Sequence, residues 1–205
     1  MHRIKRIHTS GFRRLRDFDI EMRPLMVLIG ANGVGKTSFL DGLSLLSAIA
    51  AGRLNQTLSD FGGIADAASR TSNDKIISVE TDLDCPGHEP LQYRIAIEAS
   101  GQSYRIKDES LSQNRQGKDK PFNHISSRHD NIRYYDTEQE RLLQPTWEHN
   151  PQESSLSQVP KMFKQPEELR RTLSAVTHYH SLDVSPRAPV KLPQQMKPAG
   201  LPGVN

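Results

Sequence analysis

A glycine-rich segment between an unbroken apolar run and a helical pattern constrains the fold of this chain more than any other feature. Residues 25–29 are apolar at every position, which predicts a strand buried on both faces. Three glycines follow within residues 30–35, and from Lys36 apolar residues recur at helical spacing until Gly52, which fits a helix end. Strand, glycine turn and helix in this order predict a loop whose backbone N–H groups bind phosphate oxygens.

Residues 30–37 match the P-loop pattern G-x-x-x-x-G-K-[ST] in full. Glycines are needed because side chains would keep the inward N–H groups away from the phosphates. Lys36 is expected to reach the β- and γ-phosphates, and the Thr37 hydroxyl is expected to bind Mg²⁺, which prefers oxygen ligands. ATP is the expected nucleotide, although such a loop reads phosphates and leaves the base preference open.

The predicted nucleotide-binding residues are the loop, the residue after it and one arginine of the preceding hairpin. They are Gly30, Ala31, Asn32, Gly33, Val34, Gly35, Lys36, Thr37, Ser38 and Arg13, with Thr37 as the Mg²⁺ ligand. Ser38 is placed near the α-phosphate. Arg13 lies between the first two predicted strands, from where it can reach back to the nucleotide, whereas Arg14 and Arg16 are interpreted as solvated surface residues.

The rest of the chain divides into segments of different periodicity. Residues 4–12 and 18–22 predict two strands joined by a turn, and a period of two returns from residue 75, with turn residues between short runs, which predicts an antiparallel meander. Residues 108–160 are polar and are interpreted as a loop or mobile insertion with one short strand at 132–135. The segment 161–205 predicts a helix at 166–176, a strand at 178–182 and a proline-rich extended tail from 186.

Charge and cysteine content limit the partners and the cellular compartment expected for the chain. The net charge is +3, but residues 1–24 carry seven Lys or Arg against three acids, so this end can attract polyanions, nucleotide or nucleic acid, or can be solvated. The single cysteine, Cys85, excludes an internal disulfide or a cysteine-rich zinc site and favours a reducing, cytoplasmic compartment. No apolar stretch approaches the roughly 20 residues of a membrane span, so neither export nor membrane insertion is expected.

Other residues with reactive side chains form weaker patterns. His178 and His180 share one face of their predicted strand, but no third ligand is identifiable and a structural role is favoured. Cys85 has no convincing partner in the sequence. The pair Asp108-Glu109 lacks the preceding apolar strand that a catalytic Walker B acid pair needs and is interpreted as a turn.

The start of the chain resembles the ABC-type ATPase heads of the RecF and SMC kind, closest to bacterial "predicted ATPase" proteins related to OLD-family and anti-phage ATPases. The resemblance rests on Gly-Phe-Arg-Arg-Leu, Phe-Asp-Ile-Glu-Met and the Asn-Gly form of the P-loop, and it covers residues 1 to about 55. A histidine- and proline-containing segment at 178–193 resembles the region that precedes the signature half. The resemblance implies that Arg13 contacts nucleotide, and it places a magnesium-sensing Q-loop at Gln56 or the turn 60–63.

The implied fold class is α/β: the N-terminal lobe of an ABC/SMC-type P-loop NTPase, with a mixed sheet around the P-loop strand and helix plus an antiparallel β meander. The expected organisation is a lobe at 1–107, the polar insertion at 108–160 and the helix and tail at 161–205. The family's Ser-Gly-Gly signature, its apolar strand ending in Asp-Glu and its switch histidine have no match in these residues, so no catalytic residue is identifiable.

Three functions follow as expectations. The first is an ATP-binding lobe that hydrolyses ATP only with a C-terminal ATPase half in cis or trans, homodimerises when complete, and couples hydrolysis to DNA transactions or defence. The second is a nucleotide-gated protein-interaction module without turnover of its own. A small-molecule kinase is disfavoured because simple kinases usually start at the P-loop strand, whereas two strands precede it here.

Overall fold

The computed structural model describes residues 2–69, 75–115, 117–118, 120–129 and 131–177. Within them, one eight-stranded sheet has the order β2-β1-β3-β4-β5-β6-β7-β8, and every named pairing is antiparallel. The strands are β1 Arg3–Phe12, β2 Leu15–Glu21, β3 Ile76–Asp84, β4 Leu91–Ser100, β5 Ser103–Gln113, β6 Phe122–Arg128, β7 Tyr134–Asp136 and β8 Arg141–Leu143.

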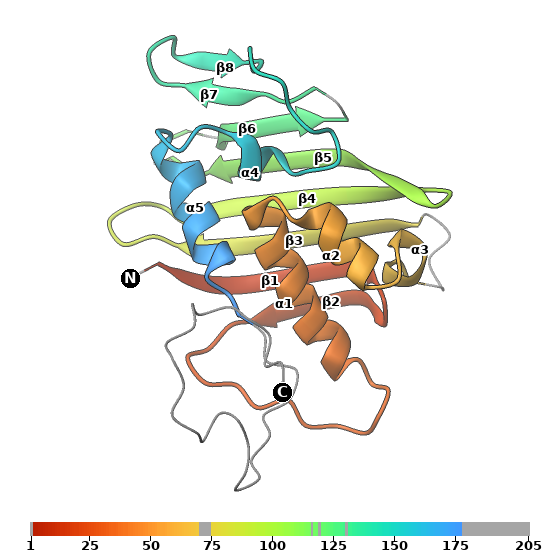
Figure 1. Ribbon diagram of the computed structural model, residues 1–205. Coiled ribbons are helices and arrows are strands. Elements are labelled where there is room, and N and C mark those ends of the chain that lie inside the picture. The colour runs from red at the N-terminus through yellow and green to blue at the C-terminus, as the bar shows by residue number, and fades with distance from the viewer. Residues whose placement is uncertain (1, 70–74, 116, 119, 130, 178–205) are drawn as a thin grey trace, which may run out of the picture.

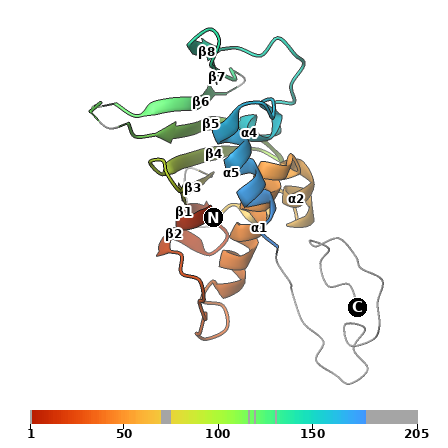
Figure 2. The ribbon, with the colours of Figure 1, turned by 90° about the vertical axis from the view of Figure 1, so that its left-hand side faces the viewer.

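The helices lie together against one face of the sheet (Figures 1 and 2). They are α1 Lys36–Ala51, α2 Leu54–Asp60, α3 Ile64–Ala67, α4 Ser155–Gln158 and α5 Lys164–Ser174. The core therefore lies between this helical layer and the covered face. No helix among the described residues is long and apolar enough to cross a membrane.

The predicted front hairpin and first helix are confirmed. β1 and β2 pair across a tight turn, with Phe12 opposite Leu15, and α1 ends before Gly52, whose φ of 67° places it in the left-handed region. Glycine suits that position because it has no Cβ to oppose a positive φ. The predicted helix at 166–176 is likewise present as α5.

The predicted buried strand at 25–29 is wrong, and so is the mixed sheet built around it. These residues form an extended connection from β2 to α1, and Leu25, Val27 and Ile29 are 83%, 74% and 89% exposed. An apolar run predicts a buried strand only if other strands and helices cover it, and no strand of the described residues pairs with this segment. In Figure 1 the connection runs below the sheet, away from the helical layer.

The predicted meander is confirmed in β3, β4 and β5. Leu91, Tyr93, Ile95 and Ile97 of β4 are at most 1% exposed, whereas Gln92 and Arg94 between them face solvent. This alternation is the period of two expected for a sheet with one covered face.

The interpretation of 108–160 as mostly loop is wrong. The segment contains the end of β5, all of β6, β7 and β8, and α4, and the strand predicted at 132–135 is present two residues later as β7. β6 is rich in Asn, Ser and Arg, and β7 and β8 have only three residues each, so composition and length resemble those of loops and hide the pairing.

The interpretation of Asp108-Glu109 as a turn is also wrong. A register shift lies at Ala96 and Ile97, where Ile97 pairs with Ile106 but Ala96 pairs with Asp108. The extra residue, Lys107, moves the buried positions of β5 by one, so that Glu109 enters the core at 1% exposure.

Buried Glu109 accepts hydrogen bonds from three donors, which together with it form the Glu109 network. The Tyr93 hydroxyl donates to Oε1 at 2.9 Å, the Leu156 N–H to Oε1 at 2.8 Å and the Ser155 N–H to Oε2 at 2.6 Å. Burial raises the pKa of Glu109, while the backbone donors and Tyr93 oppose that rise. The network joins α4, through Ser155 and Leu156, to β4 and β5 in the middle of the sheet.

The strand predicted at 178–182, the histidines His178 and His180, and the tail from 186 lie outside the described residues.

Candidate nucleotide-binding site

The loop 30–37 ends at the N-terminus of α1, and two of its glycines have backbone angles that other residues rarely adopt. Gly33 has φ 84° and Gly35 has φ 107°, and Gly35 is the N-cap of the 16-residue helix. No side chain makes a capping hydrogen bond at this helix start, and its first turn has no acidic residue. The N–H groups and the positive end of the helix dipole are therefore available to an anion.

The Lys36 side chain folds back over the loop. Its Nζ donates to the carbonyl oxygens of Gly30 at 2.6 Å and Ala31 at 2.8 Å. Lys36 as a residue is half-buried, and its ammonium is held at the start of the loop that contains the positive-φ residues Gly33 and Gly35. One full positive charge thus adds to the partial charges of the helix start.

The two hydroxyl residues that follow differ in accessibility. Thr37 is exposed at the first turn of α1, whereas Ser38 is buried at 7% exposure. An exposed Thr37 hydroxyl beside an anion site suits a hard cation such as Mg²⁺, which retains several waters. Asn32 and Val34 are also exposed, so the outer side of the loop is open to solvent.

A pocket of about 760 Å³ opens between the loop and the β1–β2 turn, and we call it the arginine pocket. Three arginines and one carboxylate give it a net positive lining, which favours anions. The full lining is Arg13, Arg14, Arg16, Gly33, Val34, Ser38, Phe61, Asp66, Ala68 and Ser69.

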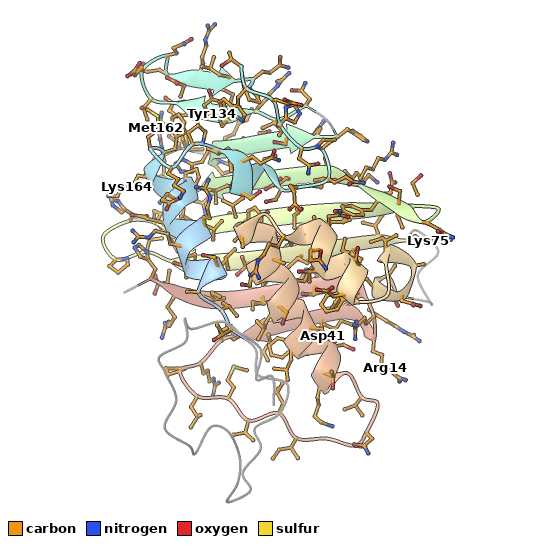
Figure 3. The ribbon with its side chains drawn as sticks, viewed as in Figure 1. Arg14, Asp41, Lys75, Tyr134, Met162 and Lys164 are labelled. Carbon is orange, nitrogen blue, oxygen red and sulfur yellow. The ribbon has the colours of Figure 1, made fainter. Side chains whose placement is uncertain are left out.

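Arg14 contacts the loop itself. Its Nη1 donates to the carbonyl oxygen of Gly33 at 2.8 Å, so the β1–β2 turn supports the middle of the glycine loop. Figure 3 shows Arg14 beside the lower part of α1, with Asp41 on that helix. The interpretation of Arg14 as a solvated surface residue therefore missed this contact, and Arg16 also lines the pocket.

Arg13 is positioned by three contacts. Its Nη1 lies 2.6 Å from Asp41 Oδ2 as an ion pair without the alignment of a hydrogen bond, and its guanidinium lies 4.6 Å from the ring centroid of Phe61. Its N–H donates to the Ala67 carbonyl at 2.8 Å, which holds its φ at 48°, a left-handed value unusual for a residue with a Cβ. The side chain keeps 29% of its surface exposed while lining the pocket.

The two Q-loop alternatives occupy different places. Gln56 lies on α2, where its Nε2 donates to Asp60 Oδ1 at 2.8 Å, and it does not line the arginine pocket. The turn 60–63 reaches the pocket through Phe61. Sequence reasoning missed Asp41 and Asp66, because only the packing of α1 and α3 against the front hairpin brings them to Arg13 and its pocket. It named Phe61 only as part of the turn 60–63.

Comparison with known proteins adds one finding to this geometry. The family model described as "AAA ATPase domain" matches residues 3–196. No protein in the curated set matches the chain.

Proposed function

The chain belongs to the AAA ATPase domain family, a family of ATP-binding P-loop ATPases, and we propose that it binds Mg²⁺–ATP at residues 30–37. In this proposal the loop N–H groups and Lys36 bind the phosphates, and Thr37 supplies a hydroxyl ligand to Mg²⁺. Asn32, Val34 and Ser38 complete the wall of the phosphate site.

The position of Lys36 is the observation that carries this proposal. Its Nζ is held by two neutral carbonyl oxygens, those of Gly30 and Ala31, at the uncapped start of α1. Phosphate oxygens carry full charge and form stronger hydrogen bonds with an ammonium group than carbonyls do. An anion entering the loop therefore gains both the lysine and the helix N–H groups without a rearrangement of the fold.

Arg13 and Arg14 have different proposed roles. Arg14 orients the loop through the Gly33 carbonyl, so it acts on the nucleotide indirectly. Arg13 is proposed to contact the nucleotide from the arginine pocket, where Asp41 and Phe61 fix its direction. A guanidinium held by an ion pair and a ring loses little freedom when it meets a phosphate.

Calorimetric titration of Mg²⁺–ATP into the chain and into Lys36→Ala tests the binding site. Loss of a charge-assisted contact to phosphate is expected to weaken affinity by roughly 10- to 100-fold. Lys161→Ala is the matched control, because Lys161 is an exposed lysine of the α4–α5 connection. Equal affinities of wild type and Lys36→Ala would remove the phosphate loop from the proposal.

We propose further that hydrolysis uses carboxylates from outside the described residues. Near the loop, Asp41 is paired with Arg13, and Asp66 lines the arginine pocket from the short helix α3, so neither follows an apolar strand as a Walker B acid does. RecF/SMC-like assembly would supply the missing groups from a second ATPase half, in cis or trans, and from an ATP-dependent dimer.

The exposed segment 25–29 is the proposed contact for that half. Leu25, Val27, Leu28 and Ile29 are exposed immediately before the phosphate loop, and a strand added there would cover them and bring its carboxyl end to the loop. Turnover measured with and without the C-terminal half of a longer relative tests this. Turnover by the chain alone that depends on Lys36 would contradict it.

A nucleotide-gated interaction module is the second candidate. The same exposed apolar segment favours it, because a change at the loop would alter the surface that a partner contacts. Tight Mg²⁺–ATP binding without turnover in any assembly would favour this candidate over the first.

In the proposed assembly, hydrolysis is coupled to DNA transactions or defence. This coupling rests on the resemblance and on the basic front of the chain, where Arg6 already pairs with Asp19 at 2.6 Å and His8 contacts Asp17 at 2.6 Å. DNA-dependent stimulation of turnover in the assembled ATPase tests it, and turnover indifferent to DNA at low salt would exclude it.

A further inference from the structure

Three metal-ligating residues from different segments meet at one end of the sheet, far from the phosphate loop. His2 directly precedes β1 and Cys85 directly follows β3, and the two strands are antiparallel with Arg3 opposite Asp84. His2 and Cys85 therefore stand across from each other where the ladder ends. Glu168 joins them from α5, and one ligand atom from each of the three lies within 4.8 Å of the others.

The polar atoms of this cluster are available. Cys85 is 3% exposed; its thiol lies 3.6 Å from the Leu83 carbonyl and receives a backbone hydrogen bond from Leu91. Nδ1 of His2 is buried and has no hydrogen-bond partner among the described residues. Glu168 is half-buried, and its nearest cation, Lys164 Nζ, lies 3.9 Å from Oε1, beyond hydrogen-bond distance.

We propose that His2, Cys85 and Glu168 bind a zinc ion. Imidazole nitrogen, thiolate and carboxylate are all established zinc ligands, and a thiolate selects zinc over Mg²⁺ or Ca²⁺. Ligand atoms of a tetrahedral zinc site lie about 3.5 Å apart, so three atoms within 4.8 Å of one another need to close by no more than about 1 Å. A water molecule completes the four ligands.

Negative charge lies close to the Cys85 thiol. The carboxylates of Glu168 and Asp84 both act on it, and negative charge at the cluster favours a cation. Zinc binding forms the zinc–sulfur bond and releases the thiol proton to solvent.

The position of the cluster indicates a structural role. It fastens the start of β1, the β3–β4 turn and α5 to one another, and both views show the start of β1 beside α5 (Figures 1 and 2). β1 has 10 residues and ends next to Arg13, so the cluster lies about 33 Å from the arginine pocket. Zinc binding is therefore expected to stabilise the fold without changing nucleotide affinity.

Cobalt substitution of the tag-free, chelator-treated chain tests the ligand set. One equivalent of Co²⁺ should give intense tetrahedral bands and a thiolate charge-transfer band, and Zn²⁺ should abolish both by displacement. Cys85→Ser should lose the charge-transfer band, and His2→Ala and Glu168→Gln should each weaken Zn²⁺ binding at least about tenfold. His149→Ala, a half-buried histidine outside the cluster, should bind as wild type does.

Two measurements on the unmodified sequence keep the proposal testable if a variant folds poorly. Saturating Zn²⁺ should raise Tm by about 5 °C or more. It should also slow maleimide labelling of Cys85, the only cysteine, and chelator should restore the rate. No Tm shift and no protection, or Co²⁺ spectra unchanged in Cys85→Ser, would overturn the site.

Discussion

The loop 30–37, with the apolar segment before it, and the Glu109 network are opposite kinds of structure in one small fold. Around the loop, backbone angles are left-handed, Leu25 and Ile29 are exposed, and the helix start has no side-chain cap. In the Glu109 network, a buried carboxylate accepts from Tyr93, Ser155 and Leu156 and lies among packed side chains. In the first region, polar and apolar groups are open to other molecules. In the second, the polar groups form hydrogen bonds with one another.

The comparison shows that the strength of a sequence motif and the packing of the residues around it are separate properties. The loop has the strongest sequence pattern of the chain and the least packed surroundings, because its residues are suited to a ligand and a neighbouring element. The Glu109 network has almost no sequence pattern, yet its buried carboxylate accepts three hydrogen bonds. Stability and binding should therefore respond to different substitutions.

A large effect on stability is expected from Glu109→Ala. It leaves three buried donors without their acceptor and should lower the free energy of unfolding by about 3 kcal/mol or more. Asp108→Ala is the matched control, since Asp108 is its half-exposed neighbour with a 3.7 Å contact to Arg128, and it should cost under about 1 kcal/mol. Urea unfolding measures both, and equal costs would show that Glu109 is not the centre of this region.

A pH effect on stability is expected from His124, a buried residue of β6. Burial, with help from Arg115, lowers the pKa of His124 to about 4. The unfolded chain binds a proton at this residue near pH 6.5 while the folded chain does not, so its contribution is complete above pH 6.5 and lost as pH falls toward 4. The loss relative to His124→Gln should reach up to about 3 kcal/mol at pH 4.

The raised pKa of Glu109 acts in the opposite direction, because it makes stability fall as pH rises. Comparing wild type with His124→Gln at each pH cancels this contribution, since Glu109 is present in both chains. Parallel stability curves for the two chains between pH 7 and pH 4 would contradict the assignment to His124.

Arg14→Ala should separate binding from stability. Losing the hydrogen bond to Gly33 is expected to lower Mg²⁺–ATP affinity by roughly tenfold and to change unfolding by no more than about 0.5 kcal/mol. Arg94→Ala removes an exposed guanidinium 3.4 Å from Glu80 on the sheet and should leave affinity unchanged. Equal affinity losses in both variants would mean that overall charge, not the loop contact, sets binding.

The smallest effect is expected from Ile29→Ala. This side chain is 89% exposed, so its truncation should change stability by less than about 0.5 kcal/mol. Ile125→Ala, at 0% exposure on β6, should cost about 2–5 kcal/mol and shows that the assay detects core losses. A cost at Ile29 above about 1 kcal/mol would mean that the segment is packed in solution.

Sequence reasoning reached the features that depend on local pattern. The loop, α1 and the β3–β5 meander follow from glycine positions and from periods of 3.6 and 2, which residues fix by themselves. The strand at 25–29 failed because an apolar run carries no information on whether a covering partner is present. The turn predicted at Asp108-Glu109 was wrong because one bulge at Lys107 reverses which side chains of β5 face the core.

The candidate site was likewise predictable only in part. Lys36 and Thr37 follow from the motif, but the contact of Arg14 with Gly33 depends on how tightly the front hairpin turns beside the loop. Asp41 and Phe61 meet Arg13 only after α1 and α2 have packed against the front hairpin. The cluster of His2, Cys85 and Glu168 joins residues that are remote in sequence and carry no spacing signal.

Hydrogen exchange with and without Mg²⁺–ATP shows whether phosphates bind inside the loop 30–37. We expect slower exchange in peptides covering 30–38, no such change in Lys36→Ala, and unchanged exchange in β5 and β6. Saturating Mg²⁺–ATP that protects another part of the chain while residues 30–38 exchange as before would contradict it.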